Sequence, residues 1–238
     1  MHTLSLQIPF TKVDPRGFLK LHDAAAMMSD VCQFQEFSEV NFRDYLKAKN
    51  ISIFLFSMQL DIFRVPEFRE NVTAAVKIYG CKSIYGLRRI TLRDGQGKLC
   101  MIANATGAFF DTVAGKAVKL DPEDMPVTFE EAEPMECLPR KISVPAGSRQ
   151  TLEPVKIQKS QLDHYGHLTS PEYFRLASDT LPDDFSYNRV RIEYKLQAKA
   201  GEIITPQIMI GSGRCFIDLK GEDGISRALL EFSTSELH

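Results

Sequence analysis

Apolar residues follow two different periods along the chain, and their order predicts alternating extended and helical segments. At the start, Leu4, Leu6, Ile8 and Phe10 alternate with other residues, which is typical of a half-buried strand. Between about 19 and 46, apolar residues recur at three- and four-residue spacings and predict one long helix, or a helix and a short second piece. Period-two segments then predict strands at 57–64, 71–80, 86–93 and 98–110.

The same succession returns after a proline-rich stretch. Residues 126–153 predict a linker with little regular structure, and we expect its acidic run to be a solvated face. A helix is expected from Ser170, where Ser can cap and Pro171 fits the first turn. Strands are expected at 155–157, 190–196, 203–210, 214–219 and 226–234. We therefore expect an N-terminal unit (1–125), the linker (126–153) and a C-terminal unit (154–238).

Matching residues indicate that the two units are copies of each other. At an offset of 149 residues, four positions of the first half meet similar positions of the second: Ile8 and Ile157, Asp14 and Asp163, Gly17 and Gly166, Leu19 and Leu168. A helix followed by an antiparallel meander buries its apolar stripe when the sheet curls around it, which is the hotdog arrangement. We predict an α+β fold, a tandem (double) hotdog whose units pair edge to edge into one continuous sheet.

Composition and charge narrow the functional classes. The 238 residues have a formal net charge of −2 and ordinary globular composition, which disfavours nucleic acid as a partner. No apolar run approaches the roughly 20 residues of a membrane span, and the first residues do not resemble an export signal. Five cysteines without a CxxC pair suit a reducing compartment, so we expect a cytoplasmic protein.

The segment 162–174 is the most informative for chemistry, because the motifs of serine hydrolases, phosphate-binding loops and zinc proteases do not occur. A turn there places Asp163 and His167 four residues apart, just before a helix whose free N–H groups can polarise a carbonyl. An imidazole beside a carboxylate is a common acid–base pair. The first copy has Phe18 at the position of His167, as expected if a duplicated pair keeps one active site.

Simpler interpretations of these residues stay open. An Asp before a turn glycine often only forms an Asx turn, so Asp163 could be structural. His164 and His167 lack further ligand-spaced partners, so we expect neither a metal nor another cofactor. Cys215 lies in a strand pattern without a motif partner, and a buried structural cysteine is expected there.

Further segments carry a family resemblance over nearly the whole chain. They are Val13-Asp14-Pro15-Arg16-Gly17, Asp61-Ile62-Phe63-Arg64-Val65-Pro66, Leu92-Arg93-Asp94-Gly95-Gln96-Gly97, Tyr173-Phe174 and Asp179-Thr180-Leu181-Pro182. In these segments, and in 163–170 at the family's D-x-N-x-H-V-N-N pattern, the chain resembles the acyl-acyl carrier protein thioesterases. This double-hotdog family releases fatty acids in plant plastids and also occurs in bacteria.

Carried over residue by residue, the family's catalytic Asp and His fall on Asp163 and His167. The intervening Asn falls on Tyr165, and the catalytic Glu of the next strand falls on Gln197. A Gln cannot take a proton from water as a carboxylate can, so two of the four positions depart from the pattern. The resemblance implies substrate contacts from the surrounding segment, at Gly166, Leu168, Thr169, Ser170 and Tyr173.

The resemblance implies hydrolysis of fatty acyl thioesters on acyl carrier protein, releasing free fatty acid in fatty acid biosynthesis. A water activated by Asp163 or His167 would attack the carbonyl, and a tunnel between the units, ending beside His167, would suit the acyl chain. The changes at Tyr165 and Gln197 keep a second hypothesis open, a non-catalytic acyl-binding or carrier-docking protein. Another acyl-thioester hotdog enzyme, a hydratase or dehydratase, is a third.

The implied partner is an acyl carrier protein with a phosphopantetheine-linked acyl chain. Carrier proteins are acidic, so docking needs basic residues near the tunnel mouth, and Lys195 and Lys199, or Arg88 and Arg89, are the candidates. Two copies of the chain could also form a homodimer.

Overall fold

The computed structural model describes residues 1–237. The first half contains β1 (His2–Gln7), the 3₁₀ turn η1 (Phe10–Lys12), α1 (Leu21–Ser38), α2 (Val40–Ala48), β2 (Ile51–Ile62), β3 (Asn71–Lys82), β4 (Tyr85–Asp94), β5 (Leu99–Asp111) and β6 (Lys116–Ala117). After the turn η2 (Pro122–Asp124), the second half contains β7 (Gln150–Thr151), β8 (Val155–Lys156), η3 (Lys159–Gln161), α3 (Ser170–Ser178), β9 (Arg189–Tyr194), β10 (Ile203–Gly211), β11 (Arg214–Gly221) and β12 (Ser226–Ser233).

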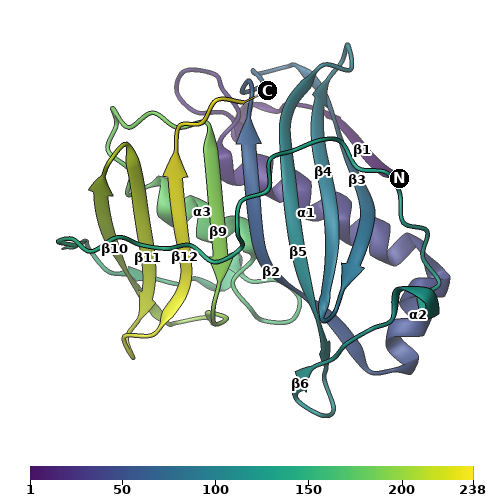
Figure 1. Cartoon of the computed structure of the whole chain (residues 1–238). Helices are drawn as coiled ribbons and strands as arrows, with labels where there is room; N and C mark the ends of the chain where they lie inside the picture. The colour runs from purple at the N-terminus through teal and green to yellow at the C-terminus, as the bar shows by residue number, and fades with distance from the viewer. Residues whose placement is uncertain (238) are drawn as a thin grey trace.

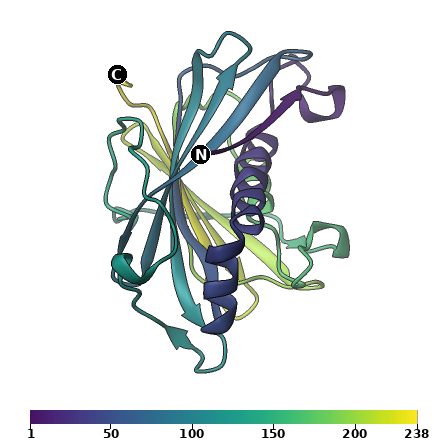
Figure 2. The same ribbon diagram turned by 90° about the vertical axis from the view of Figure 1, so that its right-hand side faces the viewer.

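The strands of the described residues form one antiparallel sheet of 12 strands. Their order is β1-β3-β4-β5-β2-β9-β12-β11-β10-β7, with β6 beside β5 and β8 beside β10. Helices α1 and α3 lie on the same face of the sheet, and the sheet curves around them (Figures 1 and 2). This is the expected double hotdog, in which β2 and β9 join the two units at the centre.

The expected elements differ from the observed ones mainly at their ends. The first helical stretch is two helices, because the chain breaks at Glu39 between α1 and α2. Strand β2 begins at Ile51, six residues earlier than the expected 57, since the apolar run from Ile51 has no clear period of two. Ser170 is the first residue of α3 and does not cap it; its N-cap position is Thr169, which makes no side-chain capping bond.

The core lies between the helices and the inner face of the sheet. Met28 and Val31 of α1 and Phe174 of α3 are fully buried there, together with alternate residues of the central strands such as Leu60 and Ile192. Burying a large apolar side chain stabilises a fold by roughly 1.5–3 kcal/mol, so the helices and sheet hold each other in place.

The two units meet along β2 and β9, which pair from Ser57↔Glu193 to Asp61↔Arg189. On the outer face of this seam, Arg189 donates from Nε and Nη2 to the two carboxylate oxygens of Asp61, at 2.7 and 2.8 Å. Both side chains are buried. The hydrogen bonds to Asp61 raise the pKa of Arg189, so the guanidinium stays charged.

Residues 126–149, which we call the strap, cross the outer face of the sheet from the first unit to the second (Figure 1). The strap contains no helix or strand within this stretch. Polar bonds hold it instead: Gln59 donates to the carbonyl of Glu136 at 2.8 Å, and Ile142 N–H donates to Glu193 at 3.2 Å. Glu133 pairs with Lys77 at 3.1 Å, so the expectation of a solvated acidic face is wrong at that residue.

Removing one partner of the buried pair at the seam should destabilise the chain strongly. Asp61→Ala leaves the Arg189 guanidinium buried with only Glu136 as an anionic neighbour, and we expect a loss of about 3–5 kcal/mol in the free energy of unfolding. Urea unfolding followed by circular dichroism measures this loss. The control is Asp44→Ala at the exposed Arg43–Asp44 pair, which should change stability by less than about 1 kcal/mol. Equal effects of the two changes would contradict the importance of the seam.

Candidate active site

The turn before α3 is held by the side chain of Asp163. Its Oδ1 accepts the backbone N–H groups of Tyr165 and His167 at 2.9 and 3.0 Å, and the Asp163 N–H donates to the His167 carbonyl at 2.8 Å. Gly166 has a φ of +80°, a conformation that favours glycine. One carboxylate oxygen of Asp163 is therefore occupied by an Asx turn.

The first copy builds the same turn around Asp14. Its Oδ1 accepts the N–H groups of Arg16 and Phe18, each at 2.9 Å, and Gly17 has a φ of +87°. Burial alone would raise the pKa of Asp14, but the hydrogen bonds from Phe18 and Arg16 outweigh it and lower the pKa. The backbone turn is thus a property of the repeated unit. The second copy differs in two side chains: His167 replaces Phe18, and Tyr165 replaces Arg16, whose guanidinium binds Asp14 Oδ2 at 3.0 Å.

The His167 side chain is free of protein partners. Its backbone forms an antiparallel bridge with Lys199, but its imidazole makes no hydrogen bond or ion pair with any other residue of 1–237. The expected side-chain pairing of His167 with Asp163 is therefore not formed in this structure. Both groups remain available to a substrate, since the Asp163 Oδ2 is also without a partner among the same residues.

The remaining two positions carried over from the family lie at the surface of the same end of the unit. Tyr165 is 69% exposed, and its ring stacks on His164 at a centroid distance of 3.8 Å. Gln197 is exposed and belongs to the loop that follows β9. This loop is next to the turn, because Leu168 N–H donates to the carbonyl of Ala198 at 2.9 Å.

Two tyrosines tie the Gln197 loop to the start of α3. The Tyr173 hydroxyl accepts the N–H of Ala198 at 3.1 Å, and the Tyr194 hydroxyl shares a 2.8 Å hydrogen bond with Ser170 Oγ. Burial raises the pKa of both phenols, so both stay protonated at neutral pH. Tyr173 and Ser170 therefore act first as supports of the site rather than as exposed substrate contacts.

Sequence reasoning missed Tyr194 as a member of this network. The period of two along β9 places Tyr194 on the inner face, but it does not show that its hydroxyl reaches Ser170. The ring of Tyr194 packs edge-on against that of Tyr173, with centroids 5.5 Å apart. The sequence carries no signal for this contact, because it depends on how β9 packs beside the start of α3.

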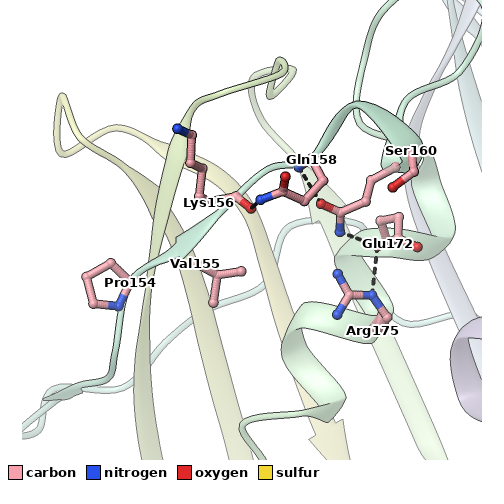
Figure 3. A pocket seen from close by; sticks show the side chains of 8 residues that line it. Pro154, Val155, Lys156, Gln158, Ser160, Glu172 and Arg175 are labelled. Carbon is pink, nitrogen blue, oxygen red and sulfur yellow. Dashed lines mark hydrogen bonds and ion pairs between the residues drawn. The ribbon is translucent and has the colours of Figure 1, made fainter.

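A polar groove lies beside α3, on the side of the helix that faces β8 (Figure 3). It has a volume of about 580 Å³, and its walls include Lys156, Gln158, Gln161, Glu172 and Arg175. Gln161 and Arg175 both donate to Glu172, at 2.6 and 2.7 Å. A second hollow of about 600 Å³ lies between the start of α2 and residues 126–130. Neither hollow is lined by His167, so neither is the expected tunnel.

The expected docking residues fall into two groups. Arg88 and Arg89 are not available: Arg88 pairs with Glu36 of α1 at 3.2 Å, and Arg89 is buried beneath the strap. Lys195 pairs with Glu193 at 2.7 Å. Lys199 is exposed and lies directly beside His167 through their backbone bridge, and so it is the basic residue nearest the candidate site by that pairing.

One cluster has the composition of a metal site but holds an arginine. Glu70, Asp94 and Cys100 offer ligand atoms within 4.8 Å of one another. The Arg64 guanidinium lies among them, with Nη2 at 2.5 Å from Glu70, 3.1 Å from Asp94 and 3.1 Å from the sulfur of Cys100. A fixed cation already supplies the charge that a metal would bring.

In the second copy, the corresponding glutamate is also bound by an arginine, but this arginine comes from a different position of the repeat. There Glu202, the counterpart of Glu70, is bound by Arg227 at 2.6 Å, and Arg227 also contacts Asp223 at 2.9 Å. In the alignment of the two units, Arg227 corresponds to Cys100 and Leu196 corresponds to Arg64. The N–H of Arg64 donates to the carbonyl of Cys100, as the N–H of Leu196 does to that of Arg227. Each unit thus neutralises one partly buried glutamate with one arginine, which comes from a different position of the repeat in each.

The curved sheet and the two helices on one of its faces define a double hotdog fold (Figure 2). Residues 1–125 match the acyl-ACP thioesterase N-terminal domain. Because this match covers more than half of the chain, the chain belongs to the acyl-ACP thioesterase family and is a hydrolase of acyl thioesters. No curated protein is similar enough in sequence to count as a further relative.

Solved structures agree with this fold. An acyl-ACP thioesterase from Bacteroides thetaiotaomicron superposes with a TM-score of 0.86 at 16% identity, covering 97% of this chain and 96% of the other. A Lactobacillus plantarum protein assigned as an oleoyl thioesterase gives 0.82 at 20% identity, covering 99% and 97%. The 12:0-ACP thioesterase from Umbellularia californica gives 0.76 at 12% identity, covering 97% and 95%.

Among the described residues, none of the helices has the length and hydropathy to cross a bilayer.

The two Asx turns should respond alike to substitution. Asp163→Ala removes the acceptor for two N–H groups, and we expect the free energy of unfolding to fall by about 1–2 kcal/mol. Asp163→Asn keeps an acceptor oxygen and should stay within about 0.5 kcal/mol of the parent protein. Asp14→Ala and Asp14→Asn are the matched pair in the first copy, and chemical unfolding measures all four. If Asn destabilised either turn as much as Ala does, the turn would not be stabilised mainly by these hydrogen bonds to the side-chain oxygen.

Proposed function

We propose that this thioester hydrolase acts on fatty acyl chains carried by acyl carrier protein and releases free fatty acid in fatty acid biosynthesis. The observation that carries the proposal is the asymmetry between two turns with the same backbone hydrogen bonds: the second holds an unpaired imidazole and a free Asp163 Oδ2, whereas the first holds Phe18, and its Asp14 Oδ2 is bound by Arg16. A reducing compartment, the cytoplasm, is part of the proposal, since all five cysteines are free thiols.

In the proposed reaction, His167 acts as the base. Its imidazole takes a proton from a water molecule as the water oxygen attacks the thioester carbonyl carbon. When the C–S bond breaks, the imidazolium returns the proton to the leaving sulfur of the phosphopantetheine arm. The products are the free acid and the carrier thiol, so atoms and charges balance.

The other site residues would position this step. Asp163 fixes the turn through Oδ1 and leaves Oδ2 to orient the imidazole when substrate binds. The amide of Gln197 would hold the attacking water by hydrogen bonds, and the exposed hydroxyl of Tyr165 would donate to the thioester oxygen. The N–H groups of Gly166, Leu168 and Thr169 already donate to the carbonyls of Asp163, Ala198 and Gln161, so these residues would shape the site rather than polarise the thioester carbonyl. Ser170 and Tyr173 keep the turn and the Gln197 loop together.

Carrier docking would use the cations around this turn. Lys199 and Lys159 are both exposed, and neither forms an ion pair within residues 1–237. Glu202, the carboxylate nearest in sequence, is already bound by Arg227. An acidic carrier would therefore meet two lysines without ion pairs near this turn, against one carboxylate without an ion pair, that of Asp163.

Loss of the imidazole should remove most of the activity. We expect His167→Ala to lower kcat by about 10²–10⁴-fold, the usual contribution of a general base. The measurement is chromatographic detection of fatty acid released from acylated carrier protein. Asp163→Asn keeps the turn but lacks the charge, and should lower kcat by a smaller factor. Asp14→Asn, its counterpart in the first copy, should match the parent protein, and an unchanged rate in His167→Ala would exclude the proposed base.

Charge reversal beside the turn should weaken recognition of the carrier without touching the chemistry. We expect Lys199→Glu to raise KM for acylated carrier protein by about tenfold, with kcat nearly unchanged, because the carrier is acidic. The same variant should keep the parent KM for an acyl-pantetheine, which has no protein surface. Lys98→Glu, at the distant exposed hairpin of the first unit, makes the same change in net charge and serves as the control. Equal KM shifts for both lysines would rule out docking at this turn.

A further inference from the structure

Arg89 is a buried cation without a carboxylate partner. It lies on the outer face of β4, is 5% exposed, and forms no ion pair within residues 1–237. Its Nε and Nη1 are buried and make no hydrogen bond to any of these residues. A buried charge without a counter-ion costs several kcal/mol, so a group that can carry negative charge is expected close to it.

The group that its remaining nitrogen reaches is the thiol of Cys137. Arg89 Nη2 lies 3.5 Å from the sulfur, which also lies 3.6 Å from the carbonyl oxygen of Met135. Cys137 belongs to the strap and is exposed, whereas Cys32, Cys100 and Cys215 are buried. Burial raises the pKa of Cys215 to about 11, which fits the structural role expected for it.

The surroundings of the pair offer no competing anion. The carboxylate of Glu133 is already bound to Lys77, the residue opposite Arg89 in the pairing of β3 with β4. The ring of Tyr79 lies 5.3 Å from the Arg89 guanidinium carbon, and its hydroxyl bonds to Asn104 at 2.6 Å. Glu136, next to Cys137 in the strap, is bound to Arg189. The sulfur is thus the group to which the free charge of Arg89 is directed.

We propose that Cys137 is a reactive thiol activated by Arg89, and that the strap carries a site for thiol–disulfide exchange with small disulfides. A guanidinium beside a sulfur favours the thiolate, which is the nucleophile in this chemistry. The Cys137 sulfur attacks one sulfur of the disulfide, and the bond between the two reagent sulfurs breaks. Its electron pair leaves with the second sulfur, which takes a proton from water. Cys137 is oxidised to a mixed disulfide, and the small molecule is reduced.

The structure also indicates what the modification would do. The attached group would stand between the strap and β4, where Cys137 faces Arg89. The hydrogen bond that Arg89 donates to this sulfur would be lost, so the strap would be held less firmly over the outer face of the sheet. The site lies on the face opposite the helices, and its chemistry is independent of the thioesterase reaction.

The test is the rate at which the native protein reacts with dithiodipyridine, a neutral disulfide that releases a coloured thione. We expect one fast equivalent per chain, located at Cys137 by peptide mass spectrometry and absent in Cys137→Ser. Arg89→Met should slow this phase at least fivefold, since the positive charge is lost at nearly constant volume. Arg149→Met removes an arginine that holds the far end of the same strap to Asp218, and should stay within twofold of the parent.

Two results would overturn the proposal: a fast phase at another cysteine, or an unchanged rate in an Arg89→Met protein that melts like the parent. If Arg89→Met does not fold, the deciding comparison uses the parent chain alone. Cys137 should then react faster in the native protein than in urea at the same pH, although unfolding exposes every cysteine. An equal or slower native rate would overturn the proposal.

Discussion

The pairing of β2 with β9 is the interaction on which the rest of the molecule depends. Five residue pairs join the two units, with Leu60 and Val190 facing the core and the Asp61–Arg189 pair facing the strap. The seam removes two sheet edges from water and fixes how α1 and α3 lie against each other. It also places the candidate site, because β9 ends at Tyr194 and the chain turns there into the loop that carries Gln197.

The repeat explains why much of this fold could be predicted from the sequence. Apolar periods and turn glycines are local signals, so element order and the double hotdog follow from them. A helix with a short second piece was one of the two expected arrangements, but neither the position of the break at Glu39 nor the early start of β2 at Ile51 could be predicted in the same way. An apolar run without a period does not show where a strand begins, and the pairing of β2 with the long strand β5 decides it.

The candidate site was predictable as a segment but not as a set of contacts. The spacing of Asp163 and His167 located the turn, and the open alternative of an Asx turn describes the bonds that Asp163 makes. No sequence signal could show that the His167 imidazole stays unpaired or that Tyr194 reaches Ser170. These facts depend on side-chain directions set by packing between segments that are far apart in the chain. The pattern of the repeat therefore located the candidate segment, and the packing determines which of its groups remain free of partners.

The exchange of arginines between the two units has a consequence for how this sequence can evolve. Arg64, in the loop after β2, and Arg227, in β12, bind equivalent glutamates. Gly221 leaves the room that Arg227 needs, since a Cβ there would lie 2.3 Å from its Nη2. Recombination that copied β5 of the first half onto the second would replace Arg227 with a cysteine while Leu196 stayed in place. Glu202, which is partly buried, would then lack its cation. The two halves are therefore not interchangeable strand for strand, even though they share one fold.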